Sequence, residues 1–532
     1  MAMAEFKVKA KPDENKLRGG FYTPESVAEY ITKWVMEKPG RYLEPSCGDG
    51  AILNFMANRN GYEITAIELD KAEAKKASKR TQMSVLNLDF FDWLTPNKRD
   101  SFDGVVGNPP YIRFGNWAEP SRSKAMNVLE REGIKPNRLT NAWMPFVVSA
   151  LLTVKNSGKV ALVVPAELLQ VSYASALRSY LIDNCSNIRI ISFKELIFPG
   201  IQQEVIILML TKGSGPAEIQ TFEVATAAEL NQIDLKSKSS VRGELHDGEK
   251  WTKYYLDSSS IKILRNLRTS GMFTKFGNYA EVQVGVVTGC NDFFCLSKSD
   301  AENRDLTRYT IPIVTRSNQL KGLSLDPKLF KELELSSGRS RLLDLSEFAF
   351  SDLPPAVVKY IHAGEKEELH KGYKCSIRND WWKVPSIWIP DGFMLRQIHK
   401  YPRIFVNEAN ATCTDTVHRI RVTGDFSVNA LSVASLNSAT LTWGELLGRS
   451  YGGGVLELEP SEARSLPIPD PKTVTPSLIK RVSGHLENDE IDQAISLVDS
   501  EILIKRLGIK RATIKRLNKD WEKLANRRLD RK

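Results

Sequence analysis

The sequence predicts an α/β fold with a mainly parallel sheet, followed by a second domain of mixed α+β character. Between Gly19 and about Lys212, short apolar runs alternate with stretches of helical periodicity. The longest apolar runs, residues 160–169 and 205–210, have the length of strands and fit strands buried on both faces. Beyond residue 245 this alternation is lost, and Trp, Tyr and Gly are frequent at irregular spacing. The two parts of the chain therefore have different architectures.

The elements of the first part follow one another in a regular order. We expect strands over residues 41–43, 63–68, 84–88, 104–107, 159–164, 188–193 and 204–211. We expect helices over residues 26–36, 51–59, 71–80, 142–154 and 173–184. Alternating strands and helices predict a parallel-type sheet that is covered on both faces.

Changes in composition divide the chain into five segments. Gly, Ser and Lys gather around residues 212–216 and 234–240, which indicates a boundary. We expect a flexible N-terminus, a first domain, a linker region, a second domain and a basic helical C-terminal segment, over residues 1–18, 19–215, 216–244, 245–470 and 471–532.

Composition excludes several classes of protein. Of the 532 residues, 42% are hydrophobic and 26% are charged, which is enough apolar residue to build cores and excludes a disordered chain. No apolar run approaches the ~18 residues of a membrane span, and the charged N-terminus lacks the apolar stretch of a signal peptide. Six cysteines are too few for a disulfide scaffold, so we expect a cytoplasmic protein. The net charge of +10 suggests a polyanionic partner.

A glycine-rich turn and an acidic strand end lie about 20 residues apart. Residues 43–51 read LEPSCGDGA and fall between an expected strand and an expected helix. Glycines such as Gly48 let the backbone turn sharply and approach a ligand beside a helix N-terminus. Glu68 lies at the carboxyl end of the next strand, where a carboxylate can bind both hydroxyls of a ribose. The pair predicts a nucleotide-type ligand; the alternative is an ordinary turn with a solvated carboxylate.

The third strand ends in a similar pair of residues at the same edge of the sheet. Asp89 can accept a hydrogen bond from an adenine amino group, while Phe90 packs on the ring. The alternative interpretation is a loop acid beside a core aromatic residue. Position alone does not decide between the two.

The most specific motif is Asn108-Pro109-Pro110-Tyr111, directly after the strand over residues 104–107. Two prolines remove two N–H donors, so this backbone stays out of the sheet ladder and its carbonyls face outward. Asn108 Oδ1 and a proline carbonyl can hold the two protons of an amino group on a planar ring, and Tyr111 can stack on that ring. The alternative is a proline-stiffened loop with a structural tyrosine.

These motifs together resemble the class I S-adenosylmethionine-dependent methyltransferases that modify exocyclic amines. The order of residues 20–24 (GFYTP), the glycine loop and the Asn-Pro-Pro-Tyr loop is similar to the γ-class DNA adenine N6-methyltransferases, which include the TaqI modification methylase. Similar strings continue at residues 163–166, 197–200, 284–289 and 448–458. The likeness covers most of residues 19–470. It implies a Rossmann-like catalytic domain and a target-recognition domain.

The resemblance implies roles for individual residues. The amine would be held by the catalytic loop Asn108, Pro109, Pro110 and Tyr111, and the flipped base would lie between Tyr111 and Phe198. S-adenosylmethionine would be bound by Thr23, Glu44, Ser46, Gly48, Glu68, Asp89, Phe90 and Phe146. The Cys47-Gly48-Asp49 loop differs from the TaqI form, so no role transfers to Asp49. Phe146 rests on a helix register and not on a motif.

The implied function is site-specific methylation of adenine N6 in double-stranded DNA, with the target base flipped out of the duplex. The modified DNA would be protected from a separate, cognate restriction endonuclease. We expect a monomer without a membrane partner. The overall likeness also suggests the XhoI-type modification methylases, which would imply CTCGAG as the recognition site. This suggestion rests on the likeness alone and not on individual residues.

Other functions are weighed against this one. A protein-glutamine or RNA amino methyltransferase could use the same loop but usually lacks a large basic, aromatic-rich second domain. An N4-cytosine methyltransferase usually has Ser where Asn108 stands, and only 18 residues precede Gly19, too few for a fused nuclease domain. A non-catalytic DNA-binding module would explain the basic C-terminal segment but leaves the four strand-end motifs unexplained.

Three further patterns concern the C-terminal cations, two cysteines and three tryptophans. Residues 501–532 hold twelve Lys and Arg against four Asp and Glu. Their paired cations would contact DNA phosphates around the turn at Gly508: Lys505, Arg506, Lys510, Arg511, Lys515 and Arg516. Cys290 and Cys295 have no nearby His, so we expect no metal site. The tryptophans at 381, 382 and 388 could contact bases but are more often core residues.

Overall fold

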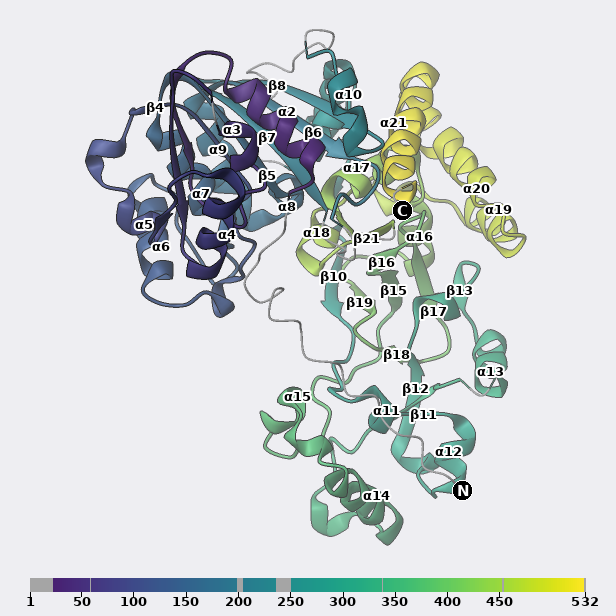
Figure 1. Ribbon diagram of the computed structural model, residues 1–532. Coiled ribbons are helices and arrows are strands. Elements are labelled where there is room, and N and C mark those ends of the chain that lie inside the picture. Colours follow the sequence, from purple (N-terminus) through teal and green to yellow (C-terminus); the bar gives the residue numbers. More distant parts are fainter. Residues whose placement is uncertain are drawn as a thin grey trace. The chain divides into compact units, whose positions relative to one another are not determined.

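The computed structural model describes residues 23–57, 59–198, 204–235, 250–336, 338–451 and 454–530. The chain forms two compact units (Figure 1). The first is Met1–Ile261 with the short segments Tyr451–Gly453 and Asp530–Lys532, and the second is Lys262–Ser450 with Gly454–Leu529. The expected flexible N-terminus, residues 20–22, Pro199 with Gly200, and residues 452–453 lie outside the described residues.

An eight-stranded sheet forms the centre of the first unit, in the order β3-β2-β1-β4-β5-β7-β6-β8. The strands are β1 (Gly40–Glu44), β2 (Tyr62–Glu68), β3 (Leu86–Asn87), β4 (Phe102–Gly107), β5 (Val154–Pro165), β6 (Cys185–Phe193), β7 (Val205–Lys212) and β8 (Glu218–Val224). The sheet is parallel except at β7, which runs antiparallel to both β5 and β6. The expected, mainly parallel sheet is therefore confirmed, and β7 is its antiparallel strand. The connection from Phe193 to Val205 is shorter than the dozen or more residues that a parallel crossover needs.

Helices cover the sheet on both faces. They are α2 (Glu25–Val35), α3 (Leu53–Met56), α4 (Lys71–Thr81), α5 (Phe90–Trp93), α6 (Ser121–Arg131), α7 (Trp143–Thr153), α8 (Glu167–Gln170) and α9 (Ser175–Asn184). Both α2 and α7 pack against β4 and β5. Ala161 and Val163 of β5 join the apolar cluster under α2, whereas the alternate residues Val160 and Leu162 are buried outside that cluster. Since side chains alternate along a strand, β5 is buried on both faces, as its apolar run predicted.

The expected linker over residues 216–244 is in part a strand. β8 pairs with β6 along its whole length, and its residues Phe222 and Val224 are buried in the core. The first unit continues to Ile261. The Gly- and Ser-rich residues before β8 form the turn into an edge strand, and residues 236–244 lie outside the described residues.

The second unit is a mixture of short strands and helices. Its two larger sheets have the orders β10-β19-β15-β17-β13 and β11-β14-β12-β18. The strands are β9 (Thr274–Lys275), β10 (Ala280–Val284), β11 (Cys295–Leu296), β12 (Thr310–Val314), β13 (Ser324–Leu325), β14 (Arg341–Leu343), β15 (Gly392–Leu395), β16 (Gln397–Ile398), β17 (Ile404–Asn407), β18 (Thr412–Cys413), β19 (Val417–Val422), β20 (Arg449–Tyr451), β21 (Val455–Glu457) and β22 (Pro467–Ile468). The helices are α10 (Ser258–Thr269), which crosses the boundary between the units, α11 (Asn291–Phe294), α12 (Lys298–Asn303), α13 (Pro327–Leu335), α14 (Pro355–Lys366), α15 (Tyr373–Ser376), α16 (Val428–Ser435), α17 (Ser438–Leu447), α18 (Pro460–Ser465), α19 (Pro476–Glu487), α20 (Ile491–Val498) and α21 (Arg511–Leu529). No helix in the described ranges is both long and apolar enough to cross a membrane.

The basic C-terminal segment is an integral part of the second unit. α21 packs against α17, and an ion pair of 2.7 Å joins Arg528 to Glu445, with both side chains almost fully buried. The apolar residues on both sides of the Gly508 turn, which form a helical hairpin, are buried: Ile502, Leu503, Ile509, Ile514 and Leu517. α20 continues into a π-helical stretch over Asp499–Ile504, and Gly508 turns the chain with a φ of +69°.

A second buried carboxylate lies beside this hairpin. Asp499 is only 6% exposed and accepts hydrogen bonds from the backbone N–H of Ser438, at 2.9 Å, and from the Ser438 hydroxyl. Burial raises the pKa of Asp499 to about 6, because desolvation of the charged form outweighs these two hydrogen bonds. The ionised carboxylate therefore lowers the stability of the fold.

Asp499→Asn should change how stability depends on pH. The folded-state pKa of about 6 lies above the unfolded value, so the protonated carboxyl is the form that the fold favours. Its contribution to stability is fully present below pH ~3.9 and is lost as pH rises through 6. Between pH 4 and pH 7 the wild type should lose about 2 kcal/mol of unfolding free energy relative to the variant. Urea unfolding across this range measures it, with the exposed Asp425→Asn as control. A constant difference between wild type and Asp499→Asn would contradict the assignment.

Candidate functional site

The predicted motifs meet at the carboxyl ends of β1, β2, β3 and β4. In this sheet β1 lies between β2 and β4, so the chain leaves β1 at the point where the strand order reverses. Ligands of open α/β sheets bind in the crevice at this point. A cavity of about 1010 Å³ opens there.

Most of the sequence-predicted residues line this one cavity. They are Thr23, Glu44, Ser46, Gly48, Glu68, Asp89, Phe90, Asn108, Pro110 and Phe146. Pro109, Tyr111 and Phe198 are not among the lining residues. Phe198 is buried in the apolar cluster under α2, and the Tyr111 ring packs against the same cluster.

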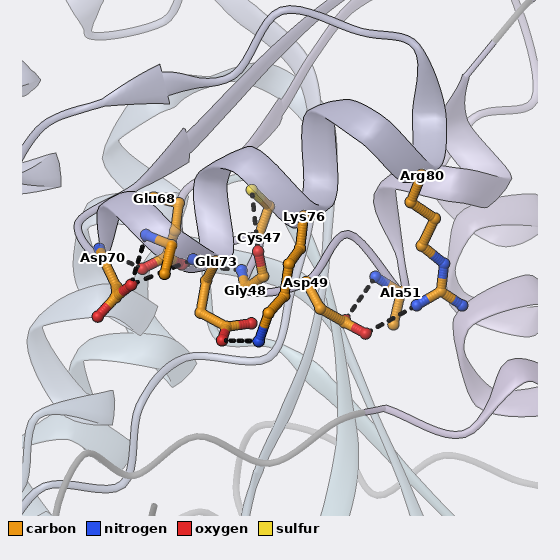
Figure 2. A network of polar contacts seen from close by, with 10 residues as sticks. Cys47, Gly48, Asp49, Ala51, Glu68, Asp70, Glu73, Lys76 and Arg80 are labelled. Atoms are coloured by element: carbon orange, nitrogen blue, oxygen red, sulfur yellow. Dashed lines mark hydrogen bonds and ion pairs between the residues drawn. The ribbon is translucent and has the colours of Figure 1, made fainter.

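The glycine loop is fixed to the end of β2 by its backbone. The Gly48 N–H donates to Glu68 Oε2 at 2.8 Å, and the Asp70 N–H donates to Glu68 Oε1 at 2.8 Å (Figure 2). A carboxylate oxygen can accept two hydrogen bonds, so each oxygen retains capacity for a ligand hydroxyl. Burial raises the pKa of Glu68, although both backbone hydrogen bonds oppose this shift. The carboxylate is thus held in place before any ligand arrives.

Asp49 connects the loop to α4. Its Oδ1 accepts from the Ala51 N–H at 3.1 Å, and its Oδ2 forms an ion pair of 2.8 Å with Arg80 (Figure 2). This residue lines the cavity, but both of its oxygens already have protein partners. Asp49 therefore shapes the loop.

Two buried polar groups in the cavity wall have no hydrogen-bond partner within the described part of the chain. These are Glu44 Oε2 and Ser46 Oγ. Burial is the largest cause that raises the pKa of Glu44 well above its usual value, and the nearby carboxylates Glu68 and Asp49 add to it. Buried polar atoms nearly always have a partner, so a ligand with donors, and in particular a cation, would complete this wall.

A cluster of aromatic residues forms another part of the cavity wall. Phe90 stacks on Phe146, with ring centroids 5.3 Å apart and an angle of 19° between the planes. Asp89 caps α5 by accepting from the Phe91 N–H at 2.8 Å. The helix register that singled out Phe146 therefore places it next to Phe90, a residue that a motif singled out.

The Asn-Pro-Pro-Tyr loop follows β4 and reaches the other side of the cavity. Asn108 Nδ2 donates to Thr23 Oγ1 at 3.2 Å, and the Tyr111 hydroxyl donates to Asn108 Oδ1 at 2.8 Å. The same hydroxyl lies 3.1 Å from the Val163 carbonyl. Burial raises the pKa of Tyr111 well above its usual value, so the phenol remains a donor. These contacts fix the amide of Asn108 at the cavity surface.

One segment that lines the cavity was not predicted from the sequence. Asp92, Asn116, Trp117, Glu119 and Lys124 also line it, and Lys124 forms an ion pair of 2.5 Å with Asp92. α6 lies in this segment, and its buried residues Ala125, Met126 and Leu129 have helical spacing. That spacing was the available signal, but the polar residues around it obscured it.

Two patterns outside the cavity have structural explanations. Trp382 is buried in an apolar cluster of the second unit that also holds Cys295, and Trp381 and Cys290 pack against it. Trp388 is half-buried, with the guanidinium groups of Arg419 and Arg421 at 4.6 and 4.5 Å from its ring centroid. Among the described residues, no group of three or more His, Cys, Asp or Glu could hold a metal ion.

Comparison with known proteins divides the chain at nearly the same place as the structure. Residues 5–255 match the family N-6 DNA Methylase, and residues 248–503 match the Type II methyltransferase M.Eco57I, C-terminal domain. Type II methyltransferase M.AccI of Acinetobacter calcoaceticus is 24% identical and covers 83% of both chains. Type II methyltransferase M.XamI of Xanthomonas campestris pv. amaranthicola is 22% identical over 85% of both, and M.HindII of Haemophilus influenzae is 24% identical over 52% of this chain and 55% of its own.

The two glycines of the loop should respond differently to substitution by alanine. Gly50 has a φ of +84°, and a Cβ there would lie 3.0 Å from the Cα of Ala77 on α4. Gly48 has a φ of +52° but nothing within 4 Å of its Cβ position. Both variants carry the ~1–2 kcal/mol cost of a left-handed backbone, and Gly50→Ala adds ~1–3 kcal/mol of overpacking. Thermal unfolding measures the difference, and equal stabilities would refute the packing argument.

Proposed function

The chain belongs to the N-6 DNA methylase family and to the type II DNA methyltransferases of restriction–modification systems, and on this premise we propose that it methylates adenine N6 at one specific site in duplex DNA. We propose S-adenosylmethionine as the methyl donor. One observation carries the proposal: Asn108 of the Asn-Pro-Pro-Tyr loop lines the same cavity as Glu68 and Asp89. A group that can hold an amine is thereby next to groups suited to a nucleoside.

The cavity wall fits S-adenosylmethionine. The two oxygens of Glu68 suit the two ribose hydroxyls, and Asp89 with Phe90 suits an adenine ring and its amino group. The unpartnered Glu44 Oε2 suits a cationic group, because a nearby positive charge favours the ionised form of a carboxylate whose pKa burial has raised. When bound, the cofactor supplies a methyl group on a positively charged sulfur as the electrophile.

Asn108 and Pro109 would activate the target amine. The lone pair of adenine N6 is delocalised into the ring, so the amine is a poor nucleophile. Asn108 Oδ1 accepts from the Tyr111 hydroxyl, and because an amide oxygen can accept more than one hydrogen bond, it would also accept a proton of the target amine. The Pro109 carbonyl would accept the second amine proton, which concentrates the lone pair on nitrogen. Correct orientation of the two reactants can lower the activation barrier by ~7–11 kcal/mol.

Tyr111 and Phe198 would hold the ring of the flipped base. Phe198 belongs to the apolar cluster under α2, and Tyr111 packs against this cluster. The Tyr111 hydroxyl bonded to Asn108 gives this residue a second role, because it limits the rotation of the amide. Stacking of a positively charged transition state on an aromatic ring contributes ~0.5–2 kcal/mol.

The second unit would supply sequence recognition. Specific sites are recognised through base edges in the grooves, whereas phosphate contacts fix the register. The match of residues 248–503 to a type II methyltransferase domain favours DNA over a protein or RNA substrate. The proposed role is protection of the cell's own DNA, in the cytoplasm, from a separate cognate endonuclease.

Asn108→Ala should lower methyl transfer by about 10²–10³-fold, because it removes an acceptor that is needed as charge develops on the amine. Affinity for S-adenosylmethionine should stay within a few-fold of wild type. Sequencing of DNA methylated by each variant, with CTCGAG as the first site to test, and isothermal titration provide the two measurements. Asn266→Ala, an exposed asparagine on α10, is the matched control.

Glu68→Gln should show the opposite pattern in the same experiment. Its cofactor affinity should fall by ~10–150-fold, because hydrogen bonds to a charged acceptor are worth ~1.5–3 kcal/mol. Turnover at saturating cofactor should fall less than in Asn108→Ala. Near-normal turnover in Asn108→Ala would rule out the assigned role of this loop.

The basic turn around Gly508 is proposed to bind DNA phosphates. Lys505, Arg506, Lys510, Arg511 and Lys515 are exposed, and Arg516 is half-buried. Lys505 forms an ion pair of 3.0 Å with Glu501, which partly neutralises its charge. Within the described residues, Lys510, Arg511 and Lys515 form no ion pair, which leaves them available for phosphates.

Replacing Lys510, Arg511 and Lys515 by alanine should weaken binding to specific and random duplexes alike. Each lost contact should reduce the slope of log affinity against log salt by ~0.9. Substitution is preferable to truncation, because Arg528 in the same helix is buried against Glu445. Lys359→Ala on α14 is the control. An unchanged salt slope in the folded triple variant would show that this turn only faces solvent.

A further inference from the structure

A hydrogen-bonded turn joins α6 to α7 in the first unit. Ile134 and Thr140 are buried at its two ends. The Asn137 N–H donates to Thr140 Oγ1 at 2.9 Å, the Thr140 N–H donates to the Asn137 carbonyl at 2.9 Å, and the Leu139 N–H donates to Asn137 Oδ1 at 2.8 Å. The turn is therefore held by its own polar groups and does not need a partner to define its shape.

The turn is attached to the chain that follows the Asn-Pro-Pro-Tyr loop. The Ala142 N–H donates to the Ile112 carbonyl at 2.9 Å, and Arg113 forms an isolated antiparallel bridge with Asn141. Ile112 also lines the cavity. Two backbone contacts thus connect the segment directly after Leu139 to Ile112 and Arg113, which directly follow the loop proposed to receive the target base.

The tip has an unusual combination of side chains. Leu139 is 67% exposed, and Arg138 beside it is also exposed. Lys135 and Arg113 add two exposed cations on the same two backbone segments. In the described part of the chain, none of these three cations forms an ion pair. An isolated exposed leucine needs no explanation. An apolar tip among cations that form no ion pair, near the proposed base pocket, has the chemistry to contact DNA: the cations suit phosphates, and the leucine suits the space left by a withdrawn base.

We propose that Leu139 enters the DNA duplex at the target step and fills the space that the flipped adenine leaves, while Arg113, Lys135 and Arg138 bind the adjacent phosphates. The inference rests on the proposed function, since the occupant of this surface is duplex DNA. Withdrawing a base costs a few kcal/mol in lost pairing and stacking. An apolar side chain that contacts the exposed faces of the neighbouring bases recovers part of this cost, and a rigid turn does so with little loss of conformational freedom.

The test compares Leu139→Ala with Leu335→Ala, a control at a leucine of similar exposure, 73%, on α13. The substrate carries the fluorescent base 2-aminopurine at the target adenine found by sequencing of methylated DNA. With the full-length protein and saturating cofactor, Leu139→Ala should lower the fluorescence increase on binding at least fivefold. It should also lower kcat/KM on paired DNA about tenfold. Leu335→Ala should match the wild type in both measurements, and cofactor affinity should be unchanged in both variants.

A second substrate separates a wedge from a merely structural residue. With an abasic site opposite the target adenine, no pairing has to be broken, so Leu139→Ala should regain activity to within threefold of wild type. Leu139→Gln, which keeps the length of the side chain but makes it polar, should resemble Leu139→Ala. Arg138→Ala should instead lower affinity and reduce the salt slope by ~0.9.

The possible outcomes distinguish this inference from the proposed function. If the wild type methylates no DNA, the proposed function fails. If the wild type methylates DNA and Leu139→Ala equals it on the paired substrate, the wedge is refuted while the proposed function stands. Equal losses on paired and abasic substrates, in Leu139→Ala and Leu139→Gln alike, would also refute it, because they would show a general defect.

Discussion

The hydrogen bond between the Gly48 N–H and the Glu68 carboxylate is the contact on which the whole site depends. β1 and β2 are paired in parallel with Glu44 opposite Ala66, so Glu68 extends two residues past the end of β1. The glycine loop crosses this extension and bonds to it (Figure 2). Burial raises the pKa of Glu44, and the nearby Glu68 carboxylate raises it further. The fold thus maintains a carboxylate pair that a cationic ligand would stabilise.

A reaction between two substrates also needs a fixed distance between the part of the site that binds the cofactor and the part that binds the amine. Here the hydrogen bond from Asn108 Nδ2 to Thr23 Oγ1 joins the Asn-Pro-Pro-Tyr loop to the segment before α2. Thr23 lines the cavity proposed for the cofactor, and Asn108 would hold the amine. Since both are anchored to the same sheet through α2 and β4, their separation is set by packing. Preorganisation of this kind keeps reacting groups at a productive distance without a cost at the time of reaction.

The sequence predicted those parts of the fold that depend on local pattern. Strand ends with a glycine turn, an acid or a proline pair could be ordered along one sheet edge, because parallel strands bring their carboxyl ends together. The antiparallel direction of β7 depends on which strands are neighbours, and no local pattern specifies that. β8 was missed because its Gly- and Ser-rich flank resembled a linker, although Phe222 and Val224 face the core. The inward hydrogen bond of Tyr111 was also out of reach, since a motif gives residue types but not rotamers.

Burial of polar groups explains why the basic segment at the C-terminus is not a loose arm. Removing one partner of the Glu445–Arg528 pair would leave a buried charge and cost ~3–5 kcal/mol, so α21 is strongly coupled to α17. Arg528 also donates to the His399 carbonyl at 2.7 Å, which ties the helix to a further segment of the second unit. The exposed cations near Gly508 are consequently carried on a rigid support. Phosphate contacts from a rigid support fix the register of a protein on DNA, whereas contacts from a flexible arm add affinity with less positional information.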